Sequence, residues 1–454
     1  MKSPFDMERL IRFLSLLLAG GLLVGEAHAQ ESYSMSMAEA VEYAYDQSFR
    51  IKTARLDLLD AQQQIVEQRS VGLPKLSGDV SFQHYIQVPK QPLPEPFVLV
   101  LEQLFPGEDV PREGAFFLRN NFTAGLGLDA MLFDATYFSG LKAARAYREY
   151  TEQELEVAKR DVRMQTINAY LPIVLSNESI EITEKNIGNL EDLLRETQAL
   201  YEAGFSEQLD VDRQRLALSN QQIQLDNLRR ERQLAIDRLK NVIGFPAEQP
   251  LEPTGDLDEM VDIANEGDLT STVVLQARPE YLLAQKGTEL GELNLEVNRS
   301  QFIPKLNGFG NYQQQYQGNN LKDGFWAPTT LVGLQLSVPI FDGFYKRSQV
   351  ERARIELERA QTQTTELARN IRLEVESART NYLTARQRVE NQQLNLDLAQ
   401  RIYDTSQEKY REGVGSSVEL TQAEQGLFQA QSNYIQALYN LLTAKVDLEI
   451  ALGN

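Results

Sequence analysis

The stretch YREGVGSSVEL, Tyr410–Leu420, separates two long polar segments in which Pro and Gly are rare. A related stretch, YEAGFSEQLDV at Tyr201–Val211, lies 209 residues earlier, and in both stretches an acidic residue follows the first glycine by six positions. Glycine can adopt the left-handed conformation that ends one helix before another begins. The two stretches therefore predict two helical hairpins, one in each half of the chain.

Three further landmarks recur in the same order in the two halves. Internal similarity of this kind indicates a repeat architecture. The pairs are LPKLSGDVSFQHY (Leu73–Tyr85) with IPKLNGFGNYQQQY (Ile303–Tyr316), LGLDAMLFD (Leu126–Asp134) with VGLQLSVPIFD (Val332–Asp342), and the half-endings VIGFP and IALGN. We therefore predict a first structural repeat over residues 30–254 and a second over residues 255–454.

Each repeat contains two long segments rich in Glu, Gln, Arg, Leu and Ala, a composition that favours helix. The predicted helices span about 138–203 and 208–243 in the first repeat, and about 345–412 and 417–451 in the second. At ~1.5 Å per residue the longer helices reach on the order of 100 Å, far beyond a globular core. The last helix carries a narrow stripe with a seven-residue period, made of Leu420, Leu427, Tyr434, Leu441 and Leu448 with Ala423, Ala430, Ala437 and Ala444 between them. Such a stripe pairs helices side by side into a wall.

Four shorter segments alternate apolar and polar residues with a period of two, about 75–88, 119–133, 305–317 and 329–341. An antiparallel sandwich with one solvated face has the same pattern. We favour membrane strands, because the apolar faces carry no charge and each segment reaches the ~9–11 residues that a tilted membrane strand needs. Four strands cannot close a barrel, and an open edge in lipid leaves backbone groups unpaired. Several chains must then pool their strands, and three chains would give twelve.

The two strand pairs enclose loops of unequal length, the proline-rich Val88–Gly114 and the short Gly318–Pro328. Insertions accumulate where the chain is exposed, so we expect both to be surface loops. The role of the first loop, 88–118, is not indicated by its sequence. The single Trp326 fits either an aromatic girdle at the membrane interface or an ordinary loop anchor.

Residues 1–29 have the basic start, short apolar core and Ala-His-Ala ending of a cleaved secretory signal peptide. The net charge of −20 argues against nucleic acid and anionic headgroups as partners. The chain has no Cys, and His84 is its only His beyond the signal, so we expect no zinc–sulfur site, no multi-histidine metal centre and no cofactor. Carboxylate pairs are too plentiful to exclude, but no catalytic motif is recognisable, and we do not expect an enzyme.

Taken together, these motifs resemble the TolC-type outer-membrane efflux proteins, also called outer membrane factors. The resemblance covers essentially the whole chain after the signal. It includes a helix over Ser36–Leu58 that starts with a capping box of Ser36 and Glu39. It also includes Arg278-Pro279-Glu280 at the start of the second repeat. In both repeats Pro-Lys-Leu precedes the strand pair, Phe-Asp follows it, and Tyr-x-x-Gly marks the turn between the long helices.

The resemblance implies a mainly α fold with a β membrane part. A homotrimer would form a 12-stranded β-barrel in outer-membrane lipid, continuous with an α-helical barrel in the periplasm. Such ducts dock on a periplasmic adaptor protein and an inner-membrane efflux pump or ABC transporter, and serve efflux or type I secretion. The chain would be a passive conduit that opens at its periplasmic tip, and the resemblance does not identify the exported substrate.

The resemblance also implies that the two turns form the periplasmic tips, where an adaptor would dock. The residues assigned to this contact are Tyr201, Gly204, Phe205, Tyr410, Gly413 and Val414. The two glycines also have a purely structural interpretation as helix caps.

An electrostatic gate beside the tips is a second implication of the resemblance. The residues assigned to it are Glu207, Asp210, Asp212, Glu419 and Gln422. The alternative is that these acids only favour helix N-termini, by ~0.3–1 kcal/mol each. An arginine that other members carry in this region is replaced by Gly415, so their latch between hairpins is not expected here, while Arg213 is expected to pair with Glu207 or Asp212.

Two other functions remain open from the residues. A periplasmic coiled-coil adaptor also carries long helical hairpins, and a trimeric surface structural protein also pools strands and coiled coils. Neither accounts for two equal repeats that are each interrupted by a pair of two-faced strands.

Overall fold

The computed structural model describes residues 33–107, 109–115, 117–255, 257 and 273–453. The predicted signal peptide, residues 1–29, lies outside this part of the chain. The chain forms two compact units. The helical unit comprises Met1–Phe49, Val162–Ala264 and Tyr382–Val446; the sheet unit comprises Arg50–Asp161, Asn265–Asn381 and Asp447–Asn454. Each unit draws on both halves of the sequence, and the division into two repeats stays a prediction.

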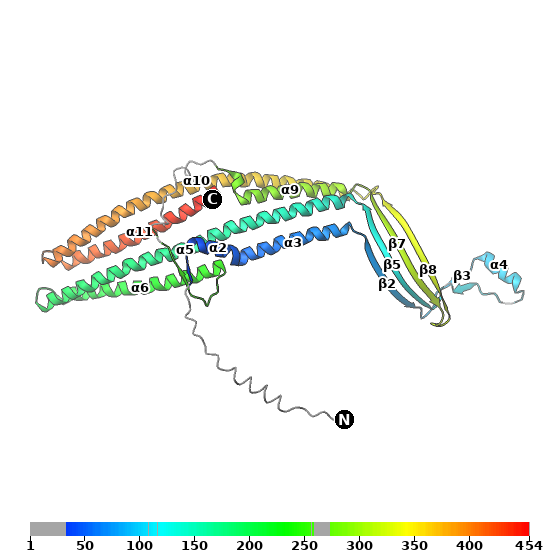
Figure 1. The fold of residues 1–454 in the computed structure, drawn as a ribbon, viewed down its shortest axis with the longest axis horizontal. Coiled ribbons are helices and arrows are strands. Elements are labelled where there is room, and N and C mark those ends of the chain that lie inside the picture. The colour runs from blue at the N-terminus through cyan, green and yellow to red at the C-terminus, as the bar shows by residue number, and fades with distance from the viewer. Residues whose placement is uncertain (1–32, 108, 116, 256, 258–272, 454) are drawn as a thin grey trace, which may run out of the picture. The chain divides into compact units, whose positions relative to one another are not determined.

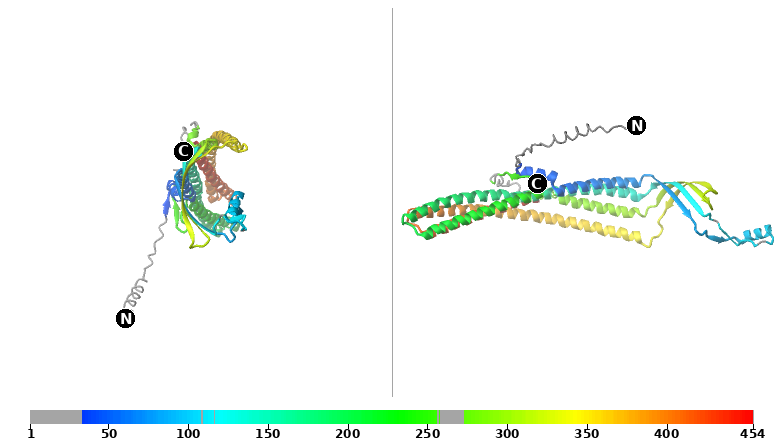
Figure 2. Two further views of the ribbon diagram at one scale, coloured as in Figure 1. Left: turned by 90° about the vertical axis from the view of Figure 1, so that its right-hand side faces the viewer. Right: turned by 90° about the horizontal axis from the view of Figure 1, so that it is seen from below.

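Two helical hairpins make up most of the helical unit. The first consists of α5 (Ala135–Glu202) and α6 (Gln208–Ile243), the second of α10 (Tyr345–Arg411) and α11 (Ser417–Leu452). Within this unit the hairpins lie side by side, and both tips are at the same end (Figure 1 and the right-hand view of Figure 2). Helix α5 starts before the predicted residue 138 because the Asp134 carboxylate accepts a 2.8 Å hydrogen bond from the Thr136 N–H and caps the first turn.

The seam of the second hairpin is apolar, as the stripe on α11 predicts. The buried residues of this stripe are Leu420, Ala423, Leu427, Ala430, Ala437, Leu441, Ala444 and Leu448. Near the tip, Tyr403 and Tyr410 of α10 pack against the stripe, and Leu193 of α5 joins the same cluster. Leu193 therefore connects the first hairpin to the core of the second.

The N-terminal segment forms two helices, although a single helix over Ser36–Leu58 was expected. Helix α2 (Met37–Gln47) starts with the expected capping box, in which the Ser36 N–H donates to Glu39 at 2.8 Å. Ser48 is extended and ends this helix, and α3 (Phe49–Val71) follows. The reason is tertiary: the end of α6 meets this break, where a Cβ on Gly244 would lie 2.5 Å from the Gln47 carbonyl oxygen.

A short parallel ribbon flanks these helices, with β1 (Tyr33–Met35) paired to β6 (Leu251–Pro253). The buried Tyr170 hydroxyl on α5 lies 2.8 Å from the Met35 carbonyl oxygen and 2.7 Å from that of Thr254. Burial and the nearby Glu39 carboxylate raise the pKa of Tyr170 to about 12, so the hydroxyl stays protonated and donates. This contact attaches both strands of the ribbon, at the same end, to α5.

The sheet unit is built around one antiparallel sheet of four strands. Their spatial order is β2 (Lys75–His84), β5 (Asn120–Phe133), β7 (Lys305–Gly318) and β8 (Gly324–Ser337). The end-on view in Figure 2 shows that the sheet is curved. Helix α3 leads into β2, and α9 (Pro279–Ser300), which follows the 3₁₀ turn η1 (Leu275–Ala277), leads into β7.

The fourth strand differs from the predicted 329–341, since β8 spans Gly324–Ser337. Trp326 therefore lies inside a strand, opposite Tyr316, and its interpretation as a loop anchor is wrong. Pro328 does not prevent pairing, because β8 is an edge strand of this sheet, where the missing N–H can face away from the ladder. The strand ends before Val338, one residue ahead of Pro339.

The long loop 88–118 has structure of its own. The first strand ends at His84 rather than at the predicted 88, and the chain then forms β3 (Lys90–Pro92) paired with β4 (Glu113–Ala115). Helix α4 (Glu95–Leu104) lies between these two strands. Phe97 and Leu104 of this helix are exposed.

The two faces of the sheet differ sharply in chemistry. The register places the even-numbered residues of all four strands on one face. This face holds no Asp, Glu, Lys or Arg, and its large apolar and aromatic residues are Leu76, Val80, Phe82, Phe122, Leu126, Leu128, Leu132, Leu306, Tyr312, Tyr316, Trp326, Val332, Leu334 and Leu336. The opposite face carries the charges of Lys75, Asp79, Asp129 and Lys305 together with Asn and Gln side chains, and it also holds Phe309, Phe325 and Leu331. The separation agrees with the predicted alternation of the four segments.

The Arg-Pro-Glu motif anchors the start of α9 in the sheet unit. The Arg278 side chain is 2% exposed and donates to Glu280 at 2.6 Å and to both Glu374 oxygens at 3.0 Å. A fourth bond goes to the Ala451 carbonyl oxygen near the end of α11. The guanidinium thereby joins α9, α10 and α11. Within the described ranges, every helix is too short or too polar to cross a membrane.

Candidate gate and docking surface at the hairpin tips

Both hairpin turns use the same backbone device. Gly204 and Gly413 adopt left-handed conformations with φ of 83° and 75°, as the turn pattern predicts. In the first turn the Phe205 N–H donates to the Leu200 carbonyl at 2.8 Å, and in the second the Val414 N–H donates to Lys409 at 3.0 Å. A bond of this span over a left-handed glycine is a Schellman motif, which satisfies the last carbonyls of the first helix.

The turns present apolar side chains to solvent at both tips. Phe205 is 83% exposed and Val414 is 79% exposed, while Tyr201 is 39% exposed. Tyr410 differs from its counterpart: it is buried in the seam of the second hairpin, and its hydroxyl has no hydrogen-bond partner. The exposed apolar surface at the tips therefore excludes Tyr410, because the seven-residue seam takes up that side chain.

Asp210 links the two hairpins through a polar network. Its carboxylate accepts bonds from Arg213 at 3.1 Å and from the Ser417 hydroxyl on α11, and Arg213 also donates to Ser417 at 2.7 Å. Burial pushes the pKa of Asp210 upward, but hydrogen bonds from Ser417, the Glu207 N–H and Ser206 outweigh this effect and hold the pKa below its ordinary value. Arg213 was expected to pair with Glu207 or Asp212; the structure pairs it with Asp210, which lies one helical turn earlier.

The other predicted gate residues are more exposed. Asp212 accepts from Gln208 at 3.0 Å and pairs with Arg215 at 3.7 Å, and both charges are more than half exposed. Glu419 pairs with Lys409 across the second turn at 3.3 Å, with about half of each side chain exposed. Glu207 and Gln422 are exposed as well. Among the described residues, no three His, Cys, Asp or Glu side chains converge as a metal site requires.

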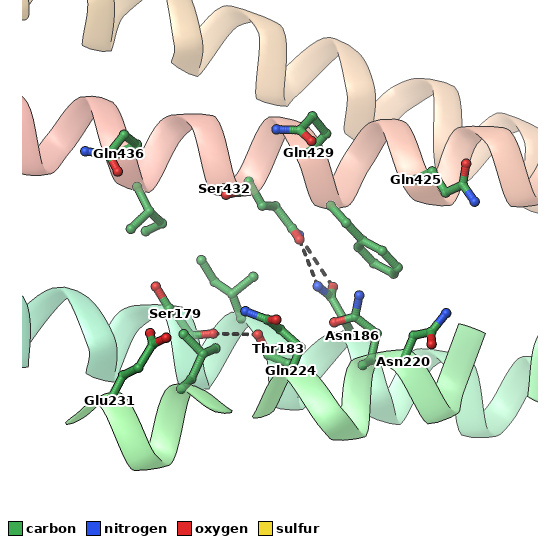
Figure 3. A pocket seen from close by; sticks show the side chains of 16 residues that line it. Ser179, Thr183, Asn186, Asn220, Gln224, Glu231, Gln425, Gln429, Ser432 and Gln436 are labelled. Atoms are coloured by element: carbon green, nitrogen blue, oxygen red, sulfur yellow. Dashed lines mark hydrogen bonds between the residues drawn. The ribbon is translucent and has the colours of Figure 1, made fainter. Parts of the chain in front are cut away.

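A polar groove of about 780 Å³ lies between the two hairpins, behind the tips (Figure 3). Most of its lining residues are Asn, Gln, Ser and Thr, including Ser179, Thr183 and Asn186 of α5, Asn220 and Gln224 of α6, and Gln425, Gln429, Ser432 and Gln436 of α11. Across the groove, Asn186 and Gln431 exchange hydrogen bonds of 2.8 and 3.4 Å. Much of the contact between the hairpins is therefore polar, with a net value of only about 0.5–1.5 kcal/mol for each neutral bond.

Two residues at this site do not follow from the sequence pattern. Ser417 joins the Asp210 network, and the only signal for it is the pair of serines at the start of α11. Glu424 is buried in the seam, one position after Ala423 of the stripe. Whether an acid next to a seam position is buried cannot be predicted from the sequence, because a small rotation of the helix about its axis decides whether the side chain faces solvent.

Comparison with known families settles the general identity of the chain. The model of a family described as "Outer membrane efflux protein" matches residues 40–245 and 271–454. The chain belongs to this outer membrane efflux protein family. Its place is therefore the outer membrane and its general function is export, as the sequence predicts, and the alternatives of an adaptor or a surface structural protein are not favoured.

Individual relatives of this outer membrane efflux protein are distant in sequence. It is 20% identical to the alkaline protease secretion protein AprF of Pseudomonas aeruginosa over 74% of this chain and 70% of AprF. It is 25% identical to the pyoverdine export outer membrane protein OpmQ of the same species, with the same coverage of each chain. The solved structure of CusC, described as forming a transmembrane channel, matches 92% of each chain with a TM-score of 0.73 and 16% identity. This last similarity concerns the fold.

Proposed function

We propose that this outer membrane efflux protein is a homotrimeric, non-catalytic exit duct of a tripartite efflux or type I secretion system. An inner-membrane efflux pump or ABC transporter would drive export through a periplasmic adaptor that docks on the duct. The names of two relatives support an export role, one naming a secreted protease and the other a pyoverdine. Because these two cargos differ in chemical class, neither is assigned to this chain.

The observation that carries the proposal is the pair of open edges on the sheet. Strands β2 and β8 are the two edges, and each leaves one side of its backbone without a strand partner within the described chain. Four alternating antiparallel strands give these edges opposite directions. The β8 edge of one copy can therefore continue the antiparallel pattern with β2 of the next, and a closed ring of three copies leaves no edge in lipid.

The two faces of the sheet fit the two sides of such a barrel. A hollow of about 540 Å³ lies at the sheet and is lined mainly by residues of the polar face, among them Asp129, Asn307 and Asn311. We assign this face to the aqueous lumen. The opposite face would contact lipid, and at one end Trp326 packs against Tyr316 and Phe122 with ring centroids 5.4 and 5.9 Å apart, as expected for an aromatic girdle.

Disulfide cross-linking between copies tests this assembly. The chain contains no Cys, so introduced thiols are the only ones present. Pairs such as Ser81→Cys on β2 with Thr329→Cys on β8, and neighbours shifted by two residues, should give covalent dimers and trimers on a denaturing gel. Pairs that combine the β2 position with Gln313→Cys on the interior strand β7 should not. Equal cross-linking of edge and interior pairs would contradict the assembly.

We further propose that the tips form the periplasmic gate, with Glu419 as the ring-forming acid. Three carboxylates around one axis attract cations and repel anions. Glu419→Ala should raise conductance and weaken cation preference in planar bilayers, and the matched variant Glu390→Ala, which removes an exposed acid of α10 outside the tips, should change neither. Unchanged ion selectivity in Glu419→Ala would remove Glu419 from the gate.

For the adaptor, we propose that Phe205 and Val414 supply the docking contact. Gly413→Pro is incompatible with the left-handed turn, since proline fixes φ near −65°. It should abolish cross-linking of an adaptor to a photo-reactive residue at position 414 while the trimer persists. Gly188→Ala is the control, because a Cβ there meets nothing within 4 Å. Undiminished cross-linking in Gly413→Pro would place docking elsewhere.

A further inference from the structure

Glu424 is a buried carboxyl group to which the proposed duct function assigns no role. It lies on α11 between Ala423 and Leu427 of the apolar seam and is 1% exposed. Neither of its carboxyl oxygens has a hydrogen-bond partner. An ionised carboxylate in such a place is very costly unless it is paired, so the group is held as the neutral acid or the packing around it opens.

Near the same tips, other buried side chains also have polar atoms without a hydrogen-bond partner. The three other helices of the two hairpins, α5, α6 and α10, each contribute one such residue. They are Thr197 of α5, the amide of Gln214 on α6, and the Tyr410 hydroxyl of α10. Buried polar groups normally find partners, so this part of the bundle keeps polar atoms that only water or a changed packing would satisfy.

The protonation of Glu424 follows from this environment. Burial raises its pKa from the ordinary value of 4.5 to about 7. Burial together with the Glu424 charge raises the pKa of Tyr403, the seam residue opposite on α10, to about 12. Tyr403 therefore stays a neutral phenol and adds no second negative charge beside Glu424.

The charged groups on the neighbouring helices are engaged elsewhere. On α10, Arg411 pairs with Glu196 of α5 at 3.0 Å, and Asp404 accepts from Gln400 at 2.8 Å. On α6, Arg213 pairs with Asp210. Other charges near the tips include the pairs Asp212–Arg215, Asp192–Arg195 and Lys409–Glu419. The acids Glu202, Glu207, Glu408 and Glu412 are exposed to solvent.

We propose that Glu424 is a proton-operated switch in the core of the helical unit. Protonated, it lets the two hairpins pack; ionised, it favours a hydrated arrangement in which they separate near their tips. The direction follows from proton linkage: the packed state binds the proton more tightly, so its advantage is complete below about pH 4.5 and is lost as pH rises to about 7. The proposed change in hairpin packing does not depend on the proposed gate. Its effect on export does rest on that gate.

Amide hydrogen exchange of the purified full-length protein in detergent tests the switch. Protection of α11 residues 417–431, corrected for intrinsic exchange rates, should fall with rising pH by up to about tenfold per unit between pH 5 and 7. Glu424→Gln removes the ionisation and should abolish this slope. Glu424→Leu should abolish it as well, which keeps the test decisive if one of the two variants packs poorly. The matched control is Glu408→Gln, an exposed acid on α10, which should keep the wild-type slope.

A flat wild-type profile would overturn the switch, and so would a slope retained in either Glu424 variant. If Glu408→Gln also lost the pH dependence of α11 protection, that dependence would come from the overall charge of the protein and not from Glu424, which would also overturn the proposal. The readout needs neither cargo nor partner. Failure of the switch therefore leaves the exit duct intact, whereas absence of a trimer would overturn the duct and leave the slope unaffected.

Discussion

Arg278 concentrates three polar contacts in one buried side chain of the sheet unit. Its guanidinium donates to two carboxylates and one backbone carbonyl, which come from α9, α10 and α11. Its Nε donates to Glu280, its Nη1 to the Ala451 carbonyl and its Nη2 to both oxygens of Glu374, and the single nitrogen of an ammonium group cannot reach three such separate partners. The contact therefore depends on arginine in particular.

Replacing Arg278 should destabilise the protein. We expect Arg278→Ala to cost roughly 1.5–3 kcal/mol, because it removes charged hydrogen bonds to Glu280 and the half-exposed Glu374 and leaves the buried Ala451 carbonyl oxygen without its donor. Arg278→Lys should recover little of this loss. Denaturant unfolding followed by circular dichroism measures the effect. The control Arg354→Ala removes an exposed pair with Glu351 and should cost at most about 1 kcal/mol, so equal losses in both variants would contradict the assigned role.

The Asp210 carboxylate should stay ionised throughout the physiological pH range and keep its bonds wherever the two hairpins are packed together. Its pKa is lowered from 3.8, so its contribution is present at every pH above about 3.8 and is lost only as pH falls below that value. Asp210→Asn should weaken the tip contact by roughly 1.5–3 kcal/mol. In a Glu424→Gln background, which removes the ionisation of Glu424, hydrogen exchange at the tips should show the same loss for Asp210→Asn at pH 5 and pH 8. An effect confined to one of these pH values would contradict this assignment.

Sequence reasoning reached some of these residues and missed others for physical reasons. The two tip glycines were predictable because a left-handed cap depends on local backbone chemistry alone. Ser417 and Glu424 were not, because their roles depend on which side chains of another helix come close. Tyr201 and Tyr410 occupy matching positions in sequence, yet only Tyr410 is buried, in a seam whose neighbours the local pattern does not specify.

The ends of the helices show how much depends on cap geometry. The tip glycines and the glycines that end the second helix of each hairpin all have positive φ. A Cβ at Gly204 meets nothing within 4 Å, whereas a Cβ at Gly244 would lie 2.5 Å from the Gln47 carbonyl oxygen and one at Gly453 would lie 2.8 Å from that of Ala277. Glycine is needed at position 204 for its positive φ alone. At positions 244 and 453 it is needed for its positive φ and because it has no Cβ.

Alanine substitution should separate these two requirements. Gly204→Ala should cost only the left-handed penalty of about 1–2 kcal/mol, and Gly204→Asn should cost less. Gly244→Ala should cost clearly more, because the backbone of the α2–α3 break must also move. Thermal unfolding of the three variants provides the comparison. Equal shifts for Gly204→Ala and Gly244→Ala would contradict the close approach at Gly244.

At the level of elements, long periodic segments were predictable and irregular ones were not. The four long helices follow from composition, and their observed ends lie within a few residues of the expected ones. The break at Ser48 was missed because it is imposed by the end of α6. Strand β8 was placed too late because Phe325–Pro328 has loop-like composition but lies on a sheet edge that tolerates proline.

At the scale of the whole molecule, the chain fits the proposed assembly of several copies. One chain supplies a two-faced sheet with open edges of opposite direction, together with two hairpins joined by largely polar contacts. The pooling of strands between chains rests on strand count and face chemistry and stays a prediction. The two compact units were not predictable from the sequence, because each combines segments from both sequence halves through contacts between distant parts of the chain.

Native mass spectrometry of the purified protein in detergent measures the number of chains that share one barrel. We expect a single dominant species with the mass of three mature chains. A folded, helical single chain that remains dispersed in buffer without detergent would contradict the shared barrel, and with it the proposed duct.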